Sequence, residues 1–205
     1  SISGLTSTGF SIFENIKYLD PTLILWRSSS QWIGGLYFLI FLIIIFSNNQ
    51  YNFRLNHLVH TGNMGSFSKS NTKNIIFQIF IVYSLLTFLI FIILNIGSVR
   101  LFNSLNLSMS IISNGGFLPA NTLNQIFFKE NHYILAIVLL IPTLNIFFLF
   151  NSYSKKKIIS NHQEDIFLIV FISVLSLLMF YSFNDIGISE IIINIISSIS
   201  NSGIS

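Results

Sequence analysis

Three short polar segments share a pattern that suits the binding of a cation. They are Thr6-Ser7-Thr8-Gly9, Ser113-Asn114-Gly115-Gly116 and Ser200-Asn201-Ser202-Gly203. Each begins with a hydroxyl residue and ends in glycine, and none holds a carboxylate. The available ligands are therefore backbone carbonyl and hydroxyl oxygens, which suit a large monovalent cation that has lost part of its hydration shell. Glycine fits this chemistry, since successive carbonyls can face one axis only where some residues take a positive φ.

The composition of the chain places these segments in a membrane. Of 205 residues, 52% are hydrophobic and only 8% are charged, whereas a soluble domain carries about 25% charged residues. This excludes a water-soluble enzyme, a disordered chain and a protein that binds nucleic acid. The absence of cysteine also excludes disulfides and thiolate metal sites.

Four apolar segments are long enough, or nearly so, to cross a bilayer as helices. They run from about residue 23 to 46, 75 to 96, 133 to 150 and 166 to 183. A bilayer core about 30 Å thick needs roughly 20 apolar residues in a helix, whereas the strands of a membrane barrel are shorter and alternate in polarity. We therefore expect an all-α integral membrane protein.

The few charged residues indicate how these spans are oriented. Loops 47–74 and 151–165 together hold six basic and two acidic residues, whereas the segments on the other side hold four basic and five acidic ones. The positive-inside rule makes the two basic loops cytoplasmic. The three polar turns then face the outside of a multi-pass protein in the inner or plasma membrane.

The apolar segments that precede the turns are too short to cross a bilayer and too apolar for exposed loops. They cover residues of about 101–112 and 189–199, and residues 1–5 have the pattern of the end of a third copy. We expect re-entrant half-helices whose negative C-terminal dipole ends point at the turns. Non-helical backbone at membrane depth is tolerated where it lines a cavity or is buried in protein.

This repetition divides the chain into three pore units, each made of a span, a half-helix, a polar turn and a second span. Residues 1–74 hold the end of a first unit with its inward span and cytoplasmic loop. Residues 75–165 form a whole second unit, and residues 166–205 begin a third that extends to its polar turn. The fold class is thus a set of repeated helix–pore loop–helix units.

A longer signature accompanies the first turn. The segment SGLTSTGF is followed by LWRSSSQWIGGLYF, and together they resemble the Trk/Ktr/HKT family of potassium-transporter membrane subunits. The signature residues are Leu25, Trp26, Arg27, Gln31, Trp32, Gly34 and Gly35. The resemblance implies K⁺-channel-like pore units, in which the backbone carbonyls of all twelve turn residues named above coordinate K⁺ as a selectivity filter.

The resemblance also bears on selectivity. In the family, glycine at the last filter position accompanies a preference for potassium, and serine there in the first filter favours sodium. All three turns carry this glycine, as Gly9, Gly116 and Gly203. Asn114 and Asn201 depart from the commoner threonine, which leaves relaxed selectivity open. Channel-like flux and ion-coupled symport both stay open as mechanisms.

The family pore is built from four units, so we expect this chain to be a fragment that does not conduct alone. The resemblance further implies a homodimer, contact with membrane lipid, and a cytosolic nucleotide-binding regulatory subunit. No cofactor is expected apart from K⁺ as the transported ion.

The alternative is a membrane subunit of a redox or proton-pumping enzyme. Such subunits need ionisable residues or haem-ligating histidines inside their spans. Segments 75–96 and 166–183 contain none, and segment 23–46 contains only Arg27 near its outer end. This favours a transporter over an enzyme.

Overall fold

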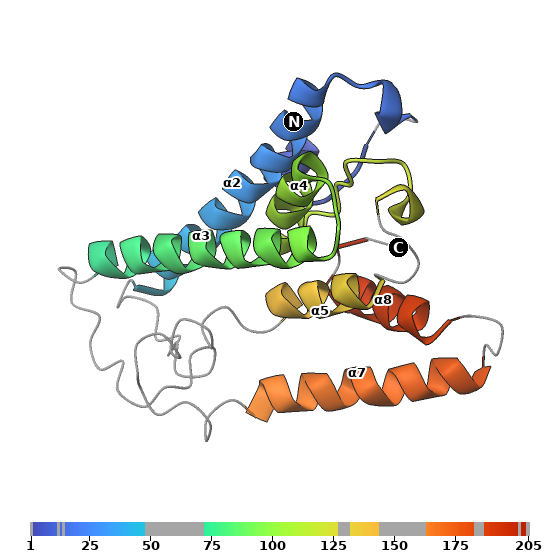
Figure 1. The fold of residues 1–205 in the computed structure, drawn as a ribbon. Helices are drawn as coiled ribbons and strands as arrows, with labels where there is room; N and C mark the ends of the chain where they lie inside the picture. The colour runs from blue at the N-terminus through green and yellow to red at the C-terminus, as the bar shows by residue number, and fades with distance from the viewer. Residues whose placement is uncertain are drawn as a thin grey trace.

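A computed structural model describes residues 2–11, 13, 15–47, 72–126, 132–143, 163–182, 187–200 and 202–203. The regular elements within these ranges are all helical: α1 (Ile2–Leu5), the 3-10 helix η1 (Ile16–Tyr18), α2 (Pro21–Ser47), α3 (Thr72–Ile96), α4 (Leu101–Ile112), the 3-10 helix η3 (Leu123–Gln125), α5 (His132–Thr143), α7 (Gln163–Ser182) and α8 (Ile188–Ile199) (Figure 1).

The four expected spans are helical wherever the structure describes them. Helices α2 and α3 have 27 and 25 residues, and α7 has 20, which at 1.5 Å per residue gives about 40, 37 and 30 Å. The span expected over 133–150 is seen as α5, and its residues 144–150 lie outside the described part. Within the described residues, the segment Ile76–Ile96 is long and apolar enough to cross a membrane.

The two short helices before the polar turns lie at the expected positions. Helix α4 covers residues 101–112 as predicted, and α8 begins one residue earlier than predicted. In α4 even polar residues such as Ser104 and Asn106 are buried. Leu107 and Ile111 of α4 and Ile196 of α8 are fully buried. Both helices therefore lie inside the protein, although neither is long enough to span a bilayer.

The helices pack in a repeated arrangement. Helix α4 contacts α3, which precedes it, and α2 of the preceding segment, while α8 contacts α7, which precedes it, and α5 of the preceding segment. Each short helix is thus held between a helix that leads into it and one from the segment before. Figure 1 shows α4 beside α2 above α3, and α8 beside α5 above α7.

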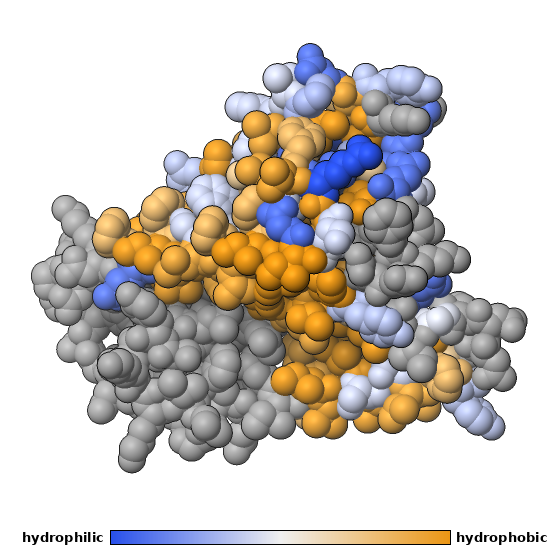
Figure 2. All heavy atoms as spheres, viewed as in Figure 1, coloured by the Kyte–Doolittle hydropathy of each residue, from blue (hydrophilic) through white to orange (hydrophobic). Residues whose placement is uncertain are grey.

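The outer surface is unusually apolar. Side chains on α7 such as Phe167, Leu177 and Tyr181 are 72%, 69% and 87% exposed. Figure 2 shows apolar residues over α3 and over most of the coloured surface below it, while hydrophilic residues gather at the upper end near the N-terminus. A surface of this kind requires lipid or further protein around it.

Candidate functional site

Each of the three polar turns ends its helix in the same way. The amide of the third turn residue donates to a carbonyl five positions back, from Thr8 to Ser3 at 3.1 Å, from Gly115 to Ser110 at 2.9 Å and from Ser202 to Ser197 at 3.1 Å. This is the longer bond of the Schellman motif, which closes a helix end by a left-handed residue. The repeat read from the sequence therefore extends to the hydrogen bonds of the backbone.

The left-handed residue is the second of each turn. Ser7 has φ +53° and Asn114 has φ +51°; Asn201, the corresponding residue of the third turn, lies outside the described residues. Asparagine tolerates this conformation better than most non-glycine residues. The backbone thus gives a physical reason for asparagine at position 114.

Glycine ends each turn for the same conformational reason. The φ angles of Gly9, Gly116 and Gly203 are +72°, +73° and +63°. The expected positive φ is therefore confirmed at all three glycines. Two reversals of handedness within four residues turn the chain from helix into an extended segment.

The hydroxyl that opens each turn bonds back to its own helix. Thr6 donates to the Ile2 carbonyl at 3.0 Å, Ser113 to the Met109 carbonyl at 3.0 Å and Ser200 to the Ser197 carbonyl at 3.2 Å. These bonds add to backbone bonds at the same helix ends, where the Ile2 carbonyl also accepts from the Thr6 amide and the Ser197 carbonyl from the Ser202 amide. By contrast, Gly115 is the one turn residue whose carbonyl accepts a hydrogen bond between described residues.

The structure brings the three turns together. A Cβ built on Gly9 would lie 2.7 Å from the carbonyl oxygen of Gly115, and one built on Gly116 would overlap the carbonyl oxygen of Ser202. The second turn therefore contacts both the first and the third. Backbone from three segments far apart in sequence lies in close contact, as a cation site built from carbonyl ligands would require.

The Gly34–Gly35 pair in the middle of α2 lets the first two turns approach that helix. A Cβ on Gly34 would lie 2.7 Å from the carbonyl carbon of Leu5, and one on Gly35 would lie 2.9 Å from the Cβ of Ser113. Glycines allow close packing of this kind between helices in membrane proteins. Helices α1 and α4 thus both end halfway along a 27-residue helix.

Beyond the turns, the chain runs along α2 toward the start of that helix. Gln31, one turn before the glycine pair, donates to the Gly115 carbonyl. Arg27, one turn further, lies 4.3 Å from the ring of Phe117 and donates to Ser11 at 3.2 Å. At the same end the Asn121 amide donates to the Asn15 side chain at 2.7 Å. These contacts fix the segments that leave the first and second turns.

Gln31 is the residue of this site whose role the sequence did not reveal. It belongs to the Trp-Arg and Gln-Trp-Gly-Gly signature, but its contact with residue 115 depends on how two distant segments pack. The sequence feature that could have indicated this contact is a difference between the turns. The third residue is Thr8 in the first turn, Gly115 in the second and Ser202 in the third. A glycine where the other two turns carry a hydroxyl indicates a neighbour in that space.

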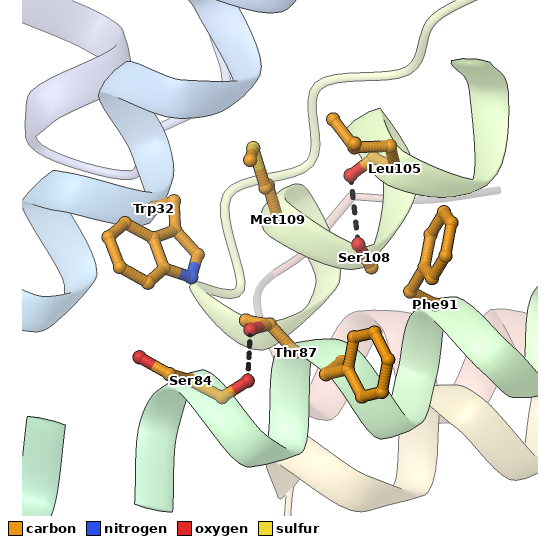
Figure 3. Close-up of a pocket in the computed structure, with 8 residues that line it drawn as sticks. Trp32, Ser84, Thr87, Phe91, Leu105, Ser108 and Met109 are labelled. Carbon is orange, nitrogen blue, oxygen red and sulfur yellow. Dashed lines mark hydrogen bonds between the residues drawn. The ribbon is translucent and has the colours of Figure 1, made fainter. Parts of the chain in front are cut away.

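A separate cavity of about 350 Å³ lies between α2, α3 and α4. Its lining is mainly apolar, with Trp32, Phe88, Phe91, Leu105 and Met109, and its hydroxyl residues are Ser84, Thr87 and Ser108 (Figure 3). Thr87 donates to the Ser84 carbonyl at 2.7 Å and Ser108 to the Leu105 carbonyl at 2.8 Å. Because the lining is mainly apolar and the hydroxyl protons of Thr87 and Ser108 are used within their own helices, the cavity suits an apolar occupant better than an ion.

Short helices that end in glycine turns beside the middle of a long helix are the distinctive feature of this fold. The crystal structure of the potassium transporter TrkH from Vibrio parahaemolyticus matches 98% of this chain with a TM-score of 0.72 and 18% sequence identity. The chain therefore has the TrkH fold, and the resemblance indicated by its motifs is confirmed.

The chain also has a sequence relative that is described as a cation transporter. The chain is 28% identical over 125 residues to the uncharacterized cation transporter MJ1485 of Methanocaldococcus jannaschii, a match that covers 59% of the chain. It spans 42% of the TrkH chain and 25% of MJ1485. No model of a known protein family matches the chain.

Proposed function

We propose that this chain is part of the ion-conducting membrane subunit of a Trk-type potassium uptake system. The observation that carries the proposal is the meeting of three glycine turns whose carbonyls, apart from that of Gly115, accept no hydrogen bond between described residues. Free carbonyls held together by the fold are the ligands that replace the hydration shell of K⁺. K⁺ is the transported ion here, not a resident cofactor.

The proposed ligands are the backbone carbonyls of the twelve turn residues. They comprise Thr6, Ser7, Thr8, Gly9, Ser113, Asn114, Gly115, Gly116, Ser200, Asn201, Ser202 and Gly203. The matching φ angles and hydrogen bonds of the turns support equivalent roles for equivalent positions. Each turn with its flanking helices is then one pore unit, with boundaries at residues 1–74, 75–165 and 166–205.

The position of the turns supports a site at membrane depth. Leu5 and Ser113, at the ends of α1 and α4, pack against Gly34 and Gly35, halfway along α2. A helix that spans a bilayer places its middle near the bilayer midplane. In the proposed topology the turns open to the outside, and loops 47–74 and 151–165, almost all of which lie outside the described residues, are cytoplasmic.

The apolar outer face of the helices supports further contacts in the membrane. Exposed side chains such as Phe167 and Leu177 on α7 suit lipid or another part of the assembled transporter. The apolar cavity beside Trp32 suits a lipid chain. The family resemblance adds a homodimer and a cytosolic nucleotide-binding subunit, and transport without enzymatic turnover of a substrate.

Uptake of ⁸⁶Rb⁺ into proteoliposomes tests this function, with the protein expressed from its complete coding sequence. We expect uptake that K⁺ inhibits at much lower concentration than Na⁺. Empty liposomes prepared in parallel provide the background. A correctly inserted protein that takes up no ⁸⁶Rb⁺ contradicts the proposal, and proton flux or electron transfer in its place would support the redox or proton-pumping alternative.

A further inference from the structure

The carbonyl of Gly115 differs from the other turn carbonyls because a side chain of another helix bonds to it. Gln31 of α2 donates its Nε2–H to this oxygen, and the two residues are 84 positions apart in the sequence. The Gln31 side chain is fully buried. The bond therefore attaches the second turn to the helix that follows the first.

Gln31 occupies the space that a hydroxyl side chain fills in the other turns. The Thr8 hydroxyl donates to the Ser3 carbonyl at 3.3 Å, and the Ser202 hydroxyl is 3.5 Å from the Ser197 carbonyl. In the second turn the corresponding residue is Gly115, and a Cβ there would overlap the Gln31 amide. The φ of Gly115 lies outside the left-handed range, so space, and not backbone conformation, requires glycine here.

We propose that Gln31 is a positioning residue that holds the Gly115 carbonyl and thereby sets the cation selectivity of the second turn. This inference rests on the proposed transport function. The Gly115 oxygen is also the atom that a Cβ on Gly9 would meet at 2.7 Å, so its direction governs how the first and second turns approach each other. Selectivity between K⁺ and Na⁺ depends on the number and the field strength of the carbonyls that reach the ion.

The burial of Gln31 supports a role beyond packing. Its Oε1 atom is buried and finds no hydrogen-bond partner among the described residues. A buried polar atom without a partner destabilises the fold, whereas an apolar side chain of similar size would avoid this cost. The bond from Nε2 to Gly115 is the contact that an apolar side chain could not replace.

Release of the Gly115 carbonyl should weaken discrimination more than it slows transport. Without Gln31, the peptide group after Gly115 can rotate, and its oxygen can approach a smaller ion. Na⁺ then gains more from the change than K⁺, because the held carbonyl no longer imposes one distance from the axis. Loss of the bond is expected to change the ratio of the K⁺ and Na⁺ affinities by about tenfold. This factor corresponds to the free energy that one typical hydrogen bond contributes.

The test compares Gln31→Ala, Gly115→Ser and the double variant in the protein expressed from its complete coding sequence. Competition of Na⁺ against ⁸⁶Rb⁺ uptake in proteoliposomes gives the selectivity, and thermal denaturation in detergent gives the stability. For Gln31→Ala we expect the Na⁺ concentration that halves uptake to fall about tenfold, with the maximal rate largely kept. Gln78→Ala, at an exposed glutamine of α3, is the matched control and should change neither quantity.

The double variant separates positioning from a general loss of structure. Gly115→Ser alone should lower both stability and uptake, because the serine meets the Gln31 amide. In the Gln31→Ala background the same serine has room to bond back to the Ser110 carbonyl, as Ser202 does to Ser197, so stability should recover. Selectivity should stay low, because no donor holds the carbonyl of residue 115 in the double variant. Wild-type selectivity in Gln31→Ala or in the double variant overturns the proposal.

The two proposals fail in distinguishable ways. A wild-type protein that takes up no ⁸⁶Rb⁺ overturns the transport function and with it the selectivity role. Normal wild-type uptake with unchanged selectivity in Gln31→Ala overturns only the role of Gln31. The thermal stability of the four proteins reports on the contact between residues 31 and 115 in either case.

Discussion

Gly116 lies so close to the carbonyl oxygen of Ser202 that a Cβ on the glycine would overlap this oxygen. The contact joins the second turn to the third across 86 residues of sequence. Gly116 also has φ +73°, a conformation that costs other residues about 1–2 kcal/mol. Two independent constraints, space and backbone conformation, therefore require glycine at this position.

We predict that Gly116→Ser reduces discrimination between K⁺ and Na⁺. The serine side chain forces the second and third turns apart, so that the carbonyls no longer surround the ion at the distance that suits K⁺. We expect the preference to fall by about tenfold, which corresponds to about 1.4 kcal/mol. Competition between Na⁺ and ⁸⁶Rb⁺ uptake measures this change.

Gly187→Ser is the matched control for that variant. Gly187 is exposed and precedes α8 with φ −61°, and serine is a favourable residue at the start of a helix. Replacement of Gly187 by serine should therefore leave the selectivity between K⁺ and Na⁺ unchanged. Equal K⁺ preference in Gly116→Ser and wild type would contradict the assignment of the second turn to the ion path.

The second prediction concerns the glycine pair of α2. Gly34→Ala should destabilise the protein by about 3 kcal/mol, at the upper end of the usual cost of overpacking. Its Cβ would lie 2.7 Å from the carbonyl carbon and 2.9 Å from the Cα of Leu5, and backbone atoms cannot rotate away. Thermal denaturation of the purified protein in detergent measures the change, and Thr22→Ala at an exposed position of α2 is the control.

The glycine pair of α2 also illustrates which features of the site the sequence alone predicts and which it does not. The breaks at Ser113 and Ser200 predicted where the two short helices end. These features are local, because an apolar run that stops at serine, asparagine and glycine ends a helix wherever it lies. The identity of the partner, such as Leu5 for Gly34, is not local.

The bond from Gln31 to Gly115 is the clearest feature that the sequence could not predict. A glutamine in an apolar helix indicates that some polar partner exists, since burial of an unbonded amide is costly. Which carbonyl it reaches depends on the height at which α4 ends beside α2. Similarly, Asn114 looked like a departure from the family pattern, and only its φ of +51° shows that the helix end favours asparagine.

The third prediction tests the contact between Tyr83 and α2. The Tyr83 side chain is 1% exposed, and its hydroxyl donates to the Trp32 carbonyl at 3.2 Å. Tyr83→Phe removes this bond and should lower the free energy of unfolding by about 1 kcal/mol. The same hydroxyl would lie 2.8 Å from a Cβ on Gly35, so the substitution also creates space.

This shared space predicts coupling between the two positions. Gly35→Ala alone should destabilise the protein by roughly 2 kcal/mol through overpacking, and Tyr83→Phe should cost little or nothing in the Gly35→Ala background. A double-mutant cycle by thermal denaturation measures the coupling. Strictly additive changes would show that the two side chains do not compete for the same space.

The last prediction separates two roles of Arg27 near the outer end of α2. Its guanidinium lies 4.3 Å from the ring of Phe117 and 5.7 Å from that of Phe13, so it packs against both segments that leave the turns. Its positive charge also opposes the entry of cations. Arg27→Lys keeps the charge but loses the planar contact with the rings, and should lower stability by about 1 kcal/mol while the KM for ⁸⁶Rb⁺ stays constant.

Arg27→Met gives the complementary result, since it keeps an unbranched side chain and removes the charge. The seven residues from Arg27 to Gly34 rise about 10 Å along α2. By Coulomb's law, a charge about 10 Å from the ion changes its binding by about two- to fifteenfold for effective dielectric constants from about 80 to about 20. We therefore expect a lower KM for ⁸⁶Rb⁺ in Arg27→Met. The difference from wild type should shrink as ionic strength rises, because salt screens exposed charges. A KM equal to that of wild type at low ionic strength would show that Arg27 acts only by packing, through its contacts with Phe13 and Phe117.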